Sequence, residues 1–206
     1  MDIKVCGLTC LDDARRALDY GADCLGFVLY GKSPRSVSRM DFLRMLDLLD
    51  APGRAVAVLV DESRAFAERL ARDGALRAVQ LHGDEQAADY VGYPFPLWRA
   101  VRFEADWPCP DPEAWLAERF VVDAHVAGLR GGTGVTADWS AAADLARRRP
   151  VMLAGGLTPA NVAEAIRRVR PAGVDVASGV EQAPGRKDPA AMREFIRIAR
   201  QTEDAL

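Results

Sequence analysis

A cysteine and an aspartate stand at the ends of two short apolar runs, where their side chains could transfer protons. Cys6 closes a run near the N-terminus, and Asp123 follows Phe120-Val121-Val122. A thiolate acts as a nucleophile or general base when its pKa suits the task, and a carboxyl group of different intrinsic pKa can supply the acid. One acid and one base are what an isomerisation needs. The competing interpretations are a small core cysteine, as we expect for Cys10 and Cys24, and an aspartate that caps a helix or anchors a loop.

Three glycine-rich segments are candidates for holding an anion. Gly155-Gly156 and Ser178-Gly179 each follow an apolar run, and Gly131-Gly132-Thr133-Gly134 forms the third segment. Glycine lets backbone N–H groups approach an anion closely. Any one pair would also fit an ordinary tight turn, but the two pairs after the last two apolar runs together favour a phosphate site.

Arg35 and His82 follow two further apolar runs. Arg35 lies between Pro34 and Ser36, where its planar guanidinium could clamp a carboxylate through two hydrogen bonds. His82 precedes Gly83 and is a candidate site residue of the same kind. The alternatives are a surface arginine and a histidine that only orders its loop.

These candidate residues stand where short β-type runs stop. Segments with a 3.6-residue apolar period separate the runs, so we expect helical crossovers and a parallel sheet. The expected strands are Ile3–Cys6, Cys24–Leu29, Ala55–Val60, Ala78–Leu81, Leu97–Val101, Phe120–Asp123, Val151–Ala154 and Val174–Ala177.

Helical patterns are strongest in three places. Apolar side chains recur at i, i+3, i+4 and i+7 from Phe42 and Val162, and a similar stripe begins at Met192. The expected helix starts before these stripes are Ser38 as an N-cap, Thr158-Pro159 and Asp188-Pro189. Two weaker helices are expected within Asp84–Tyr90 and Pro112–Arg119.

Eight strand-and-helix units in 206 residues average about 26 residues each, close to the minimum for a (β/α)8 barrel. A doubly wound open sheet would more typically stop at about five or six strands and carry a Gly-rich fingerprint after the first strand, which is absent. No low-complexity linker divides the chain. We therefore predict an α/β fold, a single (β/α)8 TIM-barrel domain over residues 1–206 with a parallel eight-stranded core, and a site at the C-terminal ends of its strands.

Composition excludes several classes of protein. The net charge is −3 without a long run of one sign, so neither a nucleic-acid-binding surface nor a membrane-binding surface is expected. No apolar stretch approaches the ~18 residues of a membrane span. The 4 cysteines show no Cys-x-x-Cys spacing and have only 2 histidines to join them, which argues against a metal site. Unpaired thiols without an apolar N-terminal stretch predict a cytoplasmic protein.

Several motifs together resemble the phosphoribosylanthranilate isomerase family. They occur in the family's order and span nearly the whole chain, and they are specific jointly rather than singly. The motifs are Lys4-Val5-Cys6-Gly7, Ser33-Pro34-Arg35, Val79-Gln80-Leu81-His82-Gly83, Gly131-Gly132-Thr133-Gly134 followed by Asp138-Trp139, Leu153-Ala154-Gly155-Gly156-Leu157, and Gly173-Val174-Asp175-Val176-Ala177-Ser178-Gly179-Val180-Glu181.

The resemblance implies a barrel enzyme of tryptophan biosynthesis with no metal or organic cofactor. Its substrate would be the small molecule N-(5′-phosphoribosyl)anthranilate, converted by an Amadori rearrangement into 1-(2-carboxyphenylamino)-1-deoxyribulose 5-phosphate. The resemblance makes Cys6 the general base and Asp123 the general acid, and it associates Arg35 with the anthranilate carboxylate. The chain would be a monomer or homodimer. The other expected binding residues are His82, Gly132, Gly155, Gly156, Ser178 and Gly179.

The chain departs from the family at Ala177, where many members have a second serine. A related barrel isomerase of histidine biosynthesis catalyses the same rearrangement, but an aspartate is expected there in place of Cys6. An enzyme acting on both substrates is a further alternative. A non-catalytic barrel that binds sugar phosphates would keep the glycine loops and lose the pair formed by Cys6 and Asp123.

Overall fold

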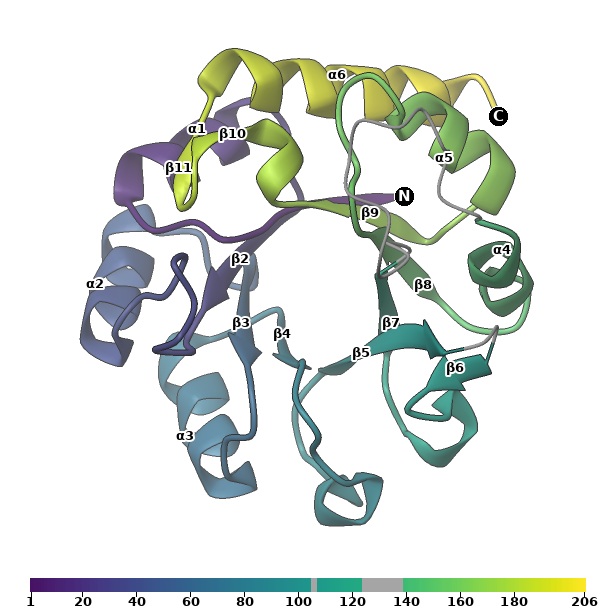
Figure 1. The fold of residues 1–206 in the computed structure, drawn as a ribbon. Coiled ribbons are helices and arrows are strands. Elements are labelled where there is room, and N and C mark those ends of the chain that lie inside the picture. Colours follow the sequence, from purple (N-terminus) through teal and green to yellow (C-terminus); the bar gives the residue numbers. More distant parts are fainter. Residues whose placement is uncertain (105–106, 124–138) are drawn as a thin grey trace.

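Eight parallel strands close into a barrel in the computed structural model, which describes residues 1–104, 107–123 and 139–206 (Figure 1). The hydrogen-bonded order is β4-β3-β2-β1-β9-β8-β7-β5, and β4 also pairs with β5, which completes the ring. The predicted parallel barrel is therefore confirmed. Its strands are β1 (Asp2–Val5), β2 (Cys24–Val28), β3 (Ala55–Leu59), β4 (Ala78–Leu81), β5 (Leu97–Glu104), β7 (Arg119–Asp123), β8 (Val151–Ala154) and β9 (Gly173–Val176).

The observed strand ends differ from the expected ones by at most one residue, except at β5. This strand continues to Glu104 because its last residues pair antiparallel with β6 (Trp107–Cys109). A second antiparallel pair, β10 (Glu181–Ala183) and β11 (Arg186–Lys187), follows the last barrel strand. Neither hairpin was expected from the sequence.

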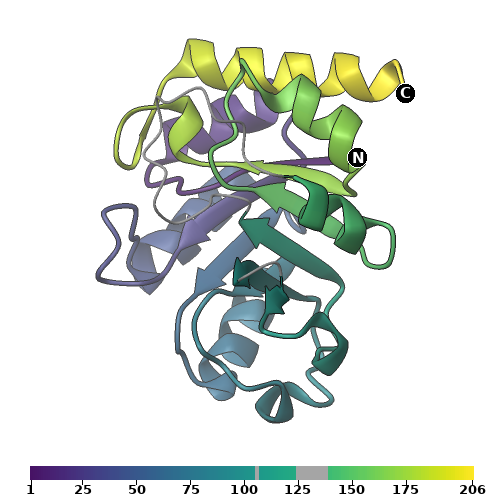
Figure 2. The ribbon, with the colours of Figure 1, turned by 45° about the vertical axis from the view of Figure 1, so that its right-hand side comes forward.

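Helices surround the strands, as both ribbon views show (Figures 1 and 2). Each helix buries an apolar face against the barrel wall, and this layer forms the larger of the two cores. The helices are α1 (Leu11–Asp19), α2 (Arg39–Leu49), α3 (Arg64–Gly74), α4 (Ser140–Ala146), α5 (Val162–Val169) and α6 (Pro189–Asp204).

The two weak helices expected after β4 and β5 are wrong as α-helices. The chain forms only short 3-10 turns there, η1 (Ala87–Tyr90) and η2 (Pro112–Ala114). Prolines at positions 94 and 96 follow η1, and prolines at 108, 110 and 112 surround the start of η2. Proline donates no backbone hydrogen bond and clashes with a preceding helical turn, so neither segment extends into an α-helix.

The predicted helix starts are confirmed at two of the three places. The Ser38 hydroxyl accepts a hydrogen bond from the Asp41 N–H before α2, and Asp188 caps α6 with Pro189 at the first helical position. Thr158-Pro159 does not begin α5, which starts at Val162. The Asn161 side chain accepts the Thr158 N–H at 2.8 Å, and this bond holds the segment in a turn ahead of the helix.

The barrel interior follows from the two-residue period of a strand, which turns alternate side chains inward. A closed layer of apolar side chains fills the lower part of the barrel around the fully buried Trp98. The layer above it is polar and contains Lys4, Gln80 and Asp175, all buried. Two residues further along the same strands lie Cys6, His82 and Ala177, at the open end of the barrel.

The two chain termini lie side by side (Figures 1 and 2). The N-terminal amine pairs with Glu203 of α6, and Arg200 donates to the Met1 carbonyl at 2.8 Å. These contacts hold the last helix against the start of the first strand. Within the described residues, no helix is long and apolar enough to cross a membrane.

Removing the cap of α6 should destabilise the fold. The Asp188 carboxylate accepts the N–H groups of Ala190 and Ala191, so Asp188→Ala should lower the free energy of unfolding by about 1 kcal/mol. Urea unfolding followed by circular dichroism measures this change. Asp204→Ala is the control, because a carboxylate at the C-terminal end of the same helix opposes the helix dipole and its loss should not destabilise. Equal losses in the two variants would contradict the capping role.

Candidate active site

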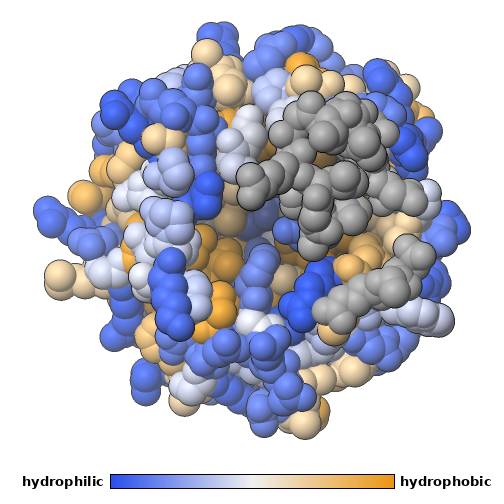
Figure 3. Space-filling model, viewed as in Figure 1, coloured by the Kyte–Doolittle hydropathy of each residue, from blue (hydrophilic) through white to orange (hydrophobic). Residues whose placement is uncertain are grey.

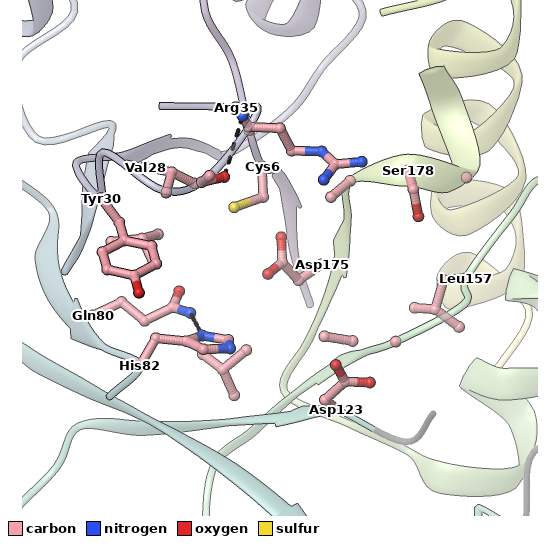
Figure 4. A pocket seen from close by; sticks show the side chains of 18 of the residues that line it. Cys6, Val28, Tyr30, Arg35, Gln80, His82, Asp123, Leu157, Asp175 and Ser178 are labelled. Atoms are coloured by element: carbon pink, nitrogen blue, oxygen red, sulfur yellow. Dashed lines mark hydrogen bonds between the residues drawn. The ribbon is translucent and has the colours of Figure 1, made fainter. Parts of the chain in front are cut away.

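A cavity of about 680 Å³ opens at the C-terminal ends of the barrel strands (Figures 3 and 4). The residues expected from the sequence meet there, although they come from six different loops and strand ends. Gly132 lies outside the described residues. The predicted residues that line the cavity are Cys6, Arg35, His82, Asp123, Gly155, Gly156, Ser178 and Gly179.

Cys6 and Asp123 face this cavity from opposite sides of the barrel mouth (Figure 4). Cys6 directly follows β1 and is 9% exposed, whereas Asp123 ends β7 and is exposed. Val121, two residues before Asp123, is buried in the barrel interior, so the strand period carries the carboxylate inward at the rim. A ligand in the cavity would therefore have a thiol and a carboxyl group within its reach.

A buried ion pair lies directly beneath the thiol. The Lys4 ammonium contacts the Asp175 carboxylate at 2.9 Å, and the Lys4 side chain is fully buried. Gly26 leaves the space that this arrangement needs: a Cβ atom there would lie 2.7 Å from the Cys6 Sγ and 3.0 Å from the Lys4 Cε. The Cys6 sulfur and the Lys4 side chain therefore both pack closely against the backbone of Gly26.

Opposing effects act on the protonation of Cys6. Burial has the largest effect and the negative charge of Asp175 adds to it, so the pKa of the thiol is raised overall, while the positive charges of Lys4 and Lys187 oppose this rise. Burial alone would lower the pKa of Lys4. Asp175 and Cys6 raise it by more than burial lowers it, so Lys4 stays a cation. The base candidate thus sits above a permanent positive charge.

His82 stands on the wall of the same cavity and is supported by Gln80. The Gln80 amide nitrogen lies 3.1 Å from His82 Nδ1, and with this nitrogen as donor the imidazole carries its proton on Nε2. Partial desolvation of the imidazole and the positive charge of Lys4 lower the pKa of His82, although the residue as a whole is exposed. A neutral imidazole at neutral pH follows.

Arg35 reaches over the backbone next to Cys6. Gly7 has a φ of +71°, and a Cβ atom there would lie 2.6 Å from the Arg35 Cδ, so glycine is required for the arginine stem to pass. The guanidinium donates to the Glu181 carboxylate from Nε at 2.9 Å and from Nη2 at 2.6 Å. Figure 4 shows the guanidinium between Cys6 and Ser178.

The two glycine pairs lie next to each other at the other side of the cavity. Gly155 and Gly156 both have positive φ values, 81° and 64°, which glycine adopts without strain. At Gly179 a Cβ atom would lie 1.8 Å from the Leu157 carbonyl oxygen, so the loops after β8 and β9 touch at a point that only glycine allows. In the described part of the chain, backbone N–H groups and the Ser178 hydroxyl offer hydrogen-bond donors on this side.

Five polar residues of this region were missed by the sequence reasoning. Lys4, Gln80 and Asp175 each interrupt an apolar strand, and this interruption was a usable signal because a buried charge needs a partner. Glu181 ends the last quoted motif but received no role there, and Lys187 lies in no quoted motif, since the contacts of both depend on the folding of a hairpin against Arg35.

No three His, Cys, Asp or Glu side chains group as metal ligands in residues 1–104, 107–123 and 139–206.

The closed barrel, with titratable side chains converging at the C-terminal ends of its strands, defines a (β/α)8-barrel enzyme. A family model described as N-(5′-phosphoribosyl)anthranilate isomerase matches residues 3–198. The chain belongs to this family.

Proteins of the same name match this chain over nearly their full length. The N-(5′-phosphoribosyl)anthranilate isomerase of Roseiflexus sp. is 45% identical over 215 residues, covering 97% of this chain and 98% of the relative. That of Pelobacter propionicus is 41% identical over 200 residues, covering 97% and 96%. The crystal structure of phosphoribosyl anthranilate isomerase from Thermotoga maritima has a TM-score of 0.82 at 33% identity, covering 98% of this chain and 99% of that one.

Removing the cation beneath Cys6 should raise the pKa of its thiol. In Lys4→Met the alkylation of Cys6 by iodoacetamide should need a higher pH than in the wild type, whereas Lys32→Met, which removes an exposed lysine, should change nothing. Mass spectrometry follows each cysteine separately, and Cys10 is the internal reference because it is exposed, which corrects the expectation that it is a core residue.

Lys4→Met leaves Asp175 as an unpaired buried charge, which is strongly destabilising. The double variant Lys4→Met/Asp175→Asn removes this problem, and it should still alkylate at higher pH because Lys4 acts on the thiol more strongly than Asp175 does. An unchanged pH dependence in a folded double variant would contradict the role of Lys4.

Proposed function

We propose that the chain catalyses the Amadori rearrangement of N-(5′-phosphoribosyl)anthranilate in tryptophan biosynthesis, with Cys6 as general base and Asp123 as general acid. The observation that carries the proposal is the convergence of these two side chains on one cavity, in a chain whose family membership extends from residue 3 to residue 198. One relative, 32% identical with a TM-score of 0.80, has been solved in complex with reduced 1-(o-carboxyphenylamino)-1-deoxyribulose 5-phosphate.

The first step opens the ribose ring. Asp123 in its acid form gives a proton to the ring oxygen, the bond between this oxygen and C1 breaks, and the nitrogen lone pair forms a protonated Schiff base. Asp123 is left as a carboxylate. Its exposed position at the rim of β7 suits contact with a ring oxygen that enters from solvent.

The second step removes a proton from C2. The iminium withdraws electrons from this carbon, so the Cys6 thiolate can take the proton, and the bonding pair forms the C1–C2 double bond of an enolamine. The enolamine then gains a proton at C1 and loses the proton of its C2 hydroxyl, which yields the ketone. The net change is an isomerisation, and neither electrons nor groups are exchanged with a cofactor.

The remaining residues would bind the two charged ends of the substrate. Arg35 lies beside Cys6 and would pair with the anthranilate carboxylate. Backbone N–H groups of Gly155, Gly156 and Gly179, together with the Ser178 hydroxyl, would hold the phosphate. Ala177 offers no hydroxyl of its own, so this phosphate site would depend mainly on the backbone.

Both members of the acid–base pair should be essential for turnover. Cys6→Ser and Asp123→Asn should each lower kcat by about 10²- to 10⁴-fold, because each removes one positioned proton-transfer group. Loss of substrate fluorescence with freshly generated N-(5′-phosphoribosyl)anthranilate measures the rate. Cys10→Ser, which changes an exposed cysteine four residues away, should retain wild-type activity. Wild-type rates in either Cys6→Ser or Asp123→Asn would refute its assigned role.

Adding a methyl group at Gly179, where the two glycine loops touch, should weaken phosphate binding. In Gly179→Ala the new Cβ must displace the Leu157 carbonyl, so KM should rise by about tenfold or more with a smaller change in kcat. Competitive inhibition by inorganic phosphate should weaken in parallel. Gly31→Ala is the control, since a Cβ there meets no atom within 4 Å. A wild-type KM in Gly179→Ala would argue against a phosphate site at these loops.

A further inference from the structure

Toward the described residues, the Arg35 guanidinium forms hydrogen bonds through one of its two edges. Its Nε donates to Glu181 Oε1 at 2.9 Å, and its Nη2 donates to Glu181 Oε2 at 2.6 Å. A guanidinium has five N–H donors in a fixed planar fork, so two parallel bonds to one carboxylate set the plane and the direction of the whole group. Glu181 therefore decides where the other edge of Arg35 points.

The second edge consists of Nη1 and the remaining N–H of Nη2. Arg35 lines the main cavity, and in the described part of the chain no residue accepts a hydrogen bond from its Nη1. Figure 4 shows the guanidinium reaching across the mouth of this cavity, between Cys6 and Ser178. This edge has the geometry that a second carboxylate, that of a ligand, would meet in the same bidentate way.

Lys187 keeps the arrangement positively charged. Its ammonium donates to Glu181 Oε1 at 2.9 Å and to the Ala177 carbonyl at 3.0 Å, and the lysine side chain is fully buried. Burial alone would raise the pKa of the Glu181 carboxyl, but the hydrogen bonds from Arg35 and Lys187 hold it below its usual range. Two cations around one carboxylate leave the group with a net charge of +1, and Arg35 is the member that lines the cavity.

The hairpin of β10 and β11 fixes Glu181 and Lys187 in place. The Lys187 N–H donates to Asp13 Oδ2 at 3.1 Å, and the Thr9 hydroxyl donates to the Gly185 carbonyl at 2.6 Å. A Cβ atom at Gly185 would lie 3.2 Å from the Pro34 carbonyl oxygen, next to Arg35. The hairpin is therefore packed against the loops after both β1 and β2.

We propose that Glu181, held by Lys187, is a positioning residue that directs the free edge of Arg35 at the substrate's carboxylate and so makes the enzyme selective for a carboxylated aryl amine. This inference rests on the proposed function. Glu181 touches no reacting atom in this account, since its effect passes through Arg35. The β10–β11 hairpin thereby contributes to substrate selectivity.

The test compares two substrates that differ only in the carboxylate: N-(5′-phosphoribosyl)anthranilate and the equivalent compound made from aniline. In Glu181→Gln the amide opposes one of the two Arg35 N–H groups, so KM for the anthranilate substrate should rise about 10- to 100-fold, with kcat changed much less. The kinetic constants for the aniline substrate should stay near those of the wild type. The selectivity ratio should fall accordingly.

Glu118→Gln is the matched control. The Glu118 carboxylate accepts two hydrogen bonds from Arg77 at the opposite end of the barrel. The same chemical change there should therefore leave the selectivity ratio unchanged. Glu181→Asp, which keeps the charge, should recover part of the ratio. Should Glu181→Gln fail to fold, Lys187→Met supplies the second test, because Glu181 would then neutralise Arg35 and KM for the anthranilate substrate should rise selectively.

If Glu181→Gln left the selectivity ratio unchanged, with kcat/KM lowered equally for both substrates or for neither, the positioning role would be overturned. A purely structural hairpin would give the equal losses. If Arg35→Met also kept the wild-type ratio, the assignment of the carboxylate to Arg35 would fail as well. If the wild type converted neither substrate, the proposed function itself would be wrong, so these failures are distinguishable.

Discussion

The buried pair of Lys4 and Asp175 is the interaction on which the rest of the site depends. Two opposite charges inside a barrel need each other as partners, and the Lys4 ammonium contacts one oxygen of the Asp175 carboxylate, Oδ2, at 2.9 Å at the centre of the polar layer. Cys6 lies directly above, in a space that Gly26 leaves open. Replacing one partner would leave a buried charge and would also change the protonation of the thiol, so stability and chemistry are linked at this point.

Charge is distributed unevenly around the cavity. Lys4 lies below the thiol, and the group of Arg35, Glu181 and Lys187 carries a net positive charge on the same side. The glycine loops after β8 and β9 contribute backbone dipoles in place of charged side chains. A ligand with a carboxylate at one end and a phosphate at the other would therefore have a preferred orientation, with its reactive carbons between Cys6 and Asp123.

Much of the fold could be predicted from the sequence, because a strand at the barrel wall must bury both faces and therefore appears as a short apolar run. The same logic located Cys6, His82 and Asp123, which stand where such runs stop. The helices expected after β4 and β5 were wrong, since nearby prolines limit these segments to 3-10 turns. The start of α5 was misplaced because the Asn161 side chain holds the preceding residues in a turn.

The contacts of Glu181 and Lys187 could not have been found from local patterns. These contacts arise because the hairpin of β10 and β11 folds back onto loops that lie 146 to 176 residues earlier in the chain, and no helical or strand period encodes such a contact. Lys4 and Asp175 are different, because a charged residue inside an apolar strand is itself a sign of a buried partner. Non-local pairing between loops is thus the main limit on deriving this site from sequence.

The central claim is that one ligand lies across the cavity with its ends held at Arg35 and the glycine loops and its C2 carbon at Cys6. A crystal structure of this chain with reduced 1-(o-carboxyphenylamino)-1-deoxyribulose 5-phosphate tests it most directly. We expect the Cys6 Sγ within about 3.5 Å of C2, the carboxylate on the free edge of Arg35 and the phosphate on the loops of Gly155-Gly156 and Ser178-Gly179. A ligand bound with its phosphate at Arg35, or with C2 out of reach of Cys6, would contradict the account.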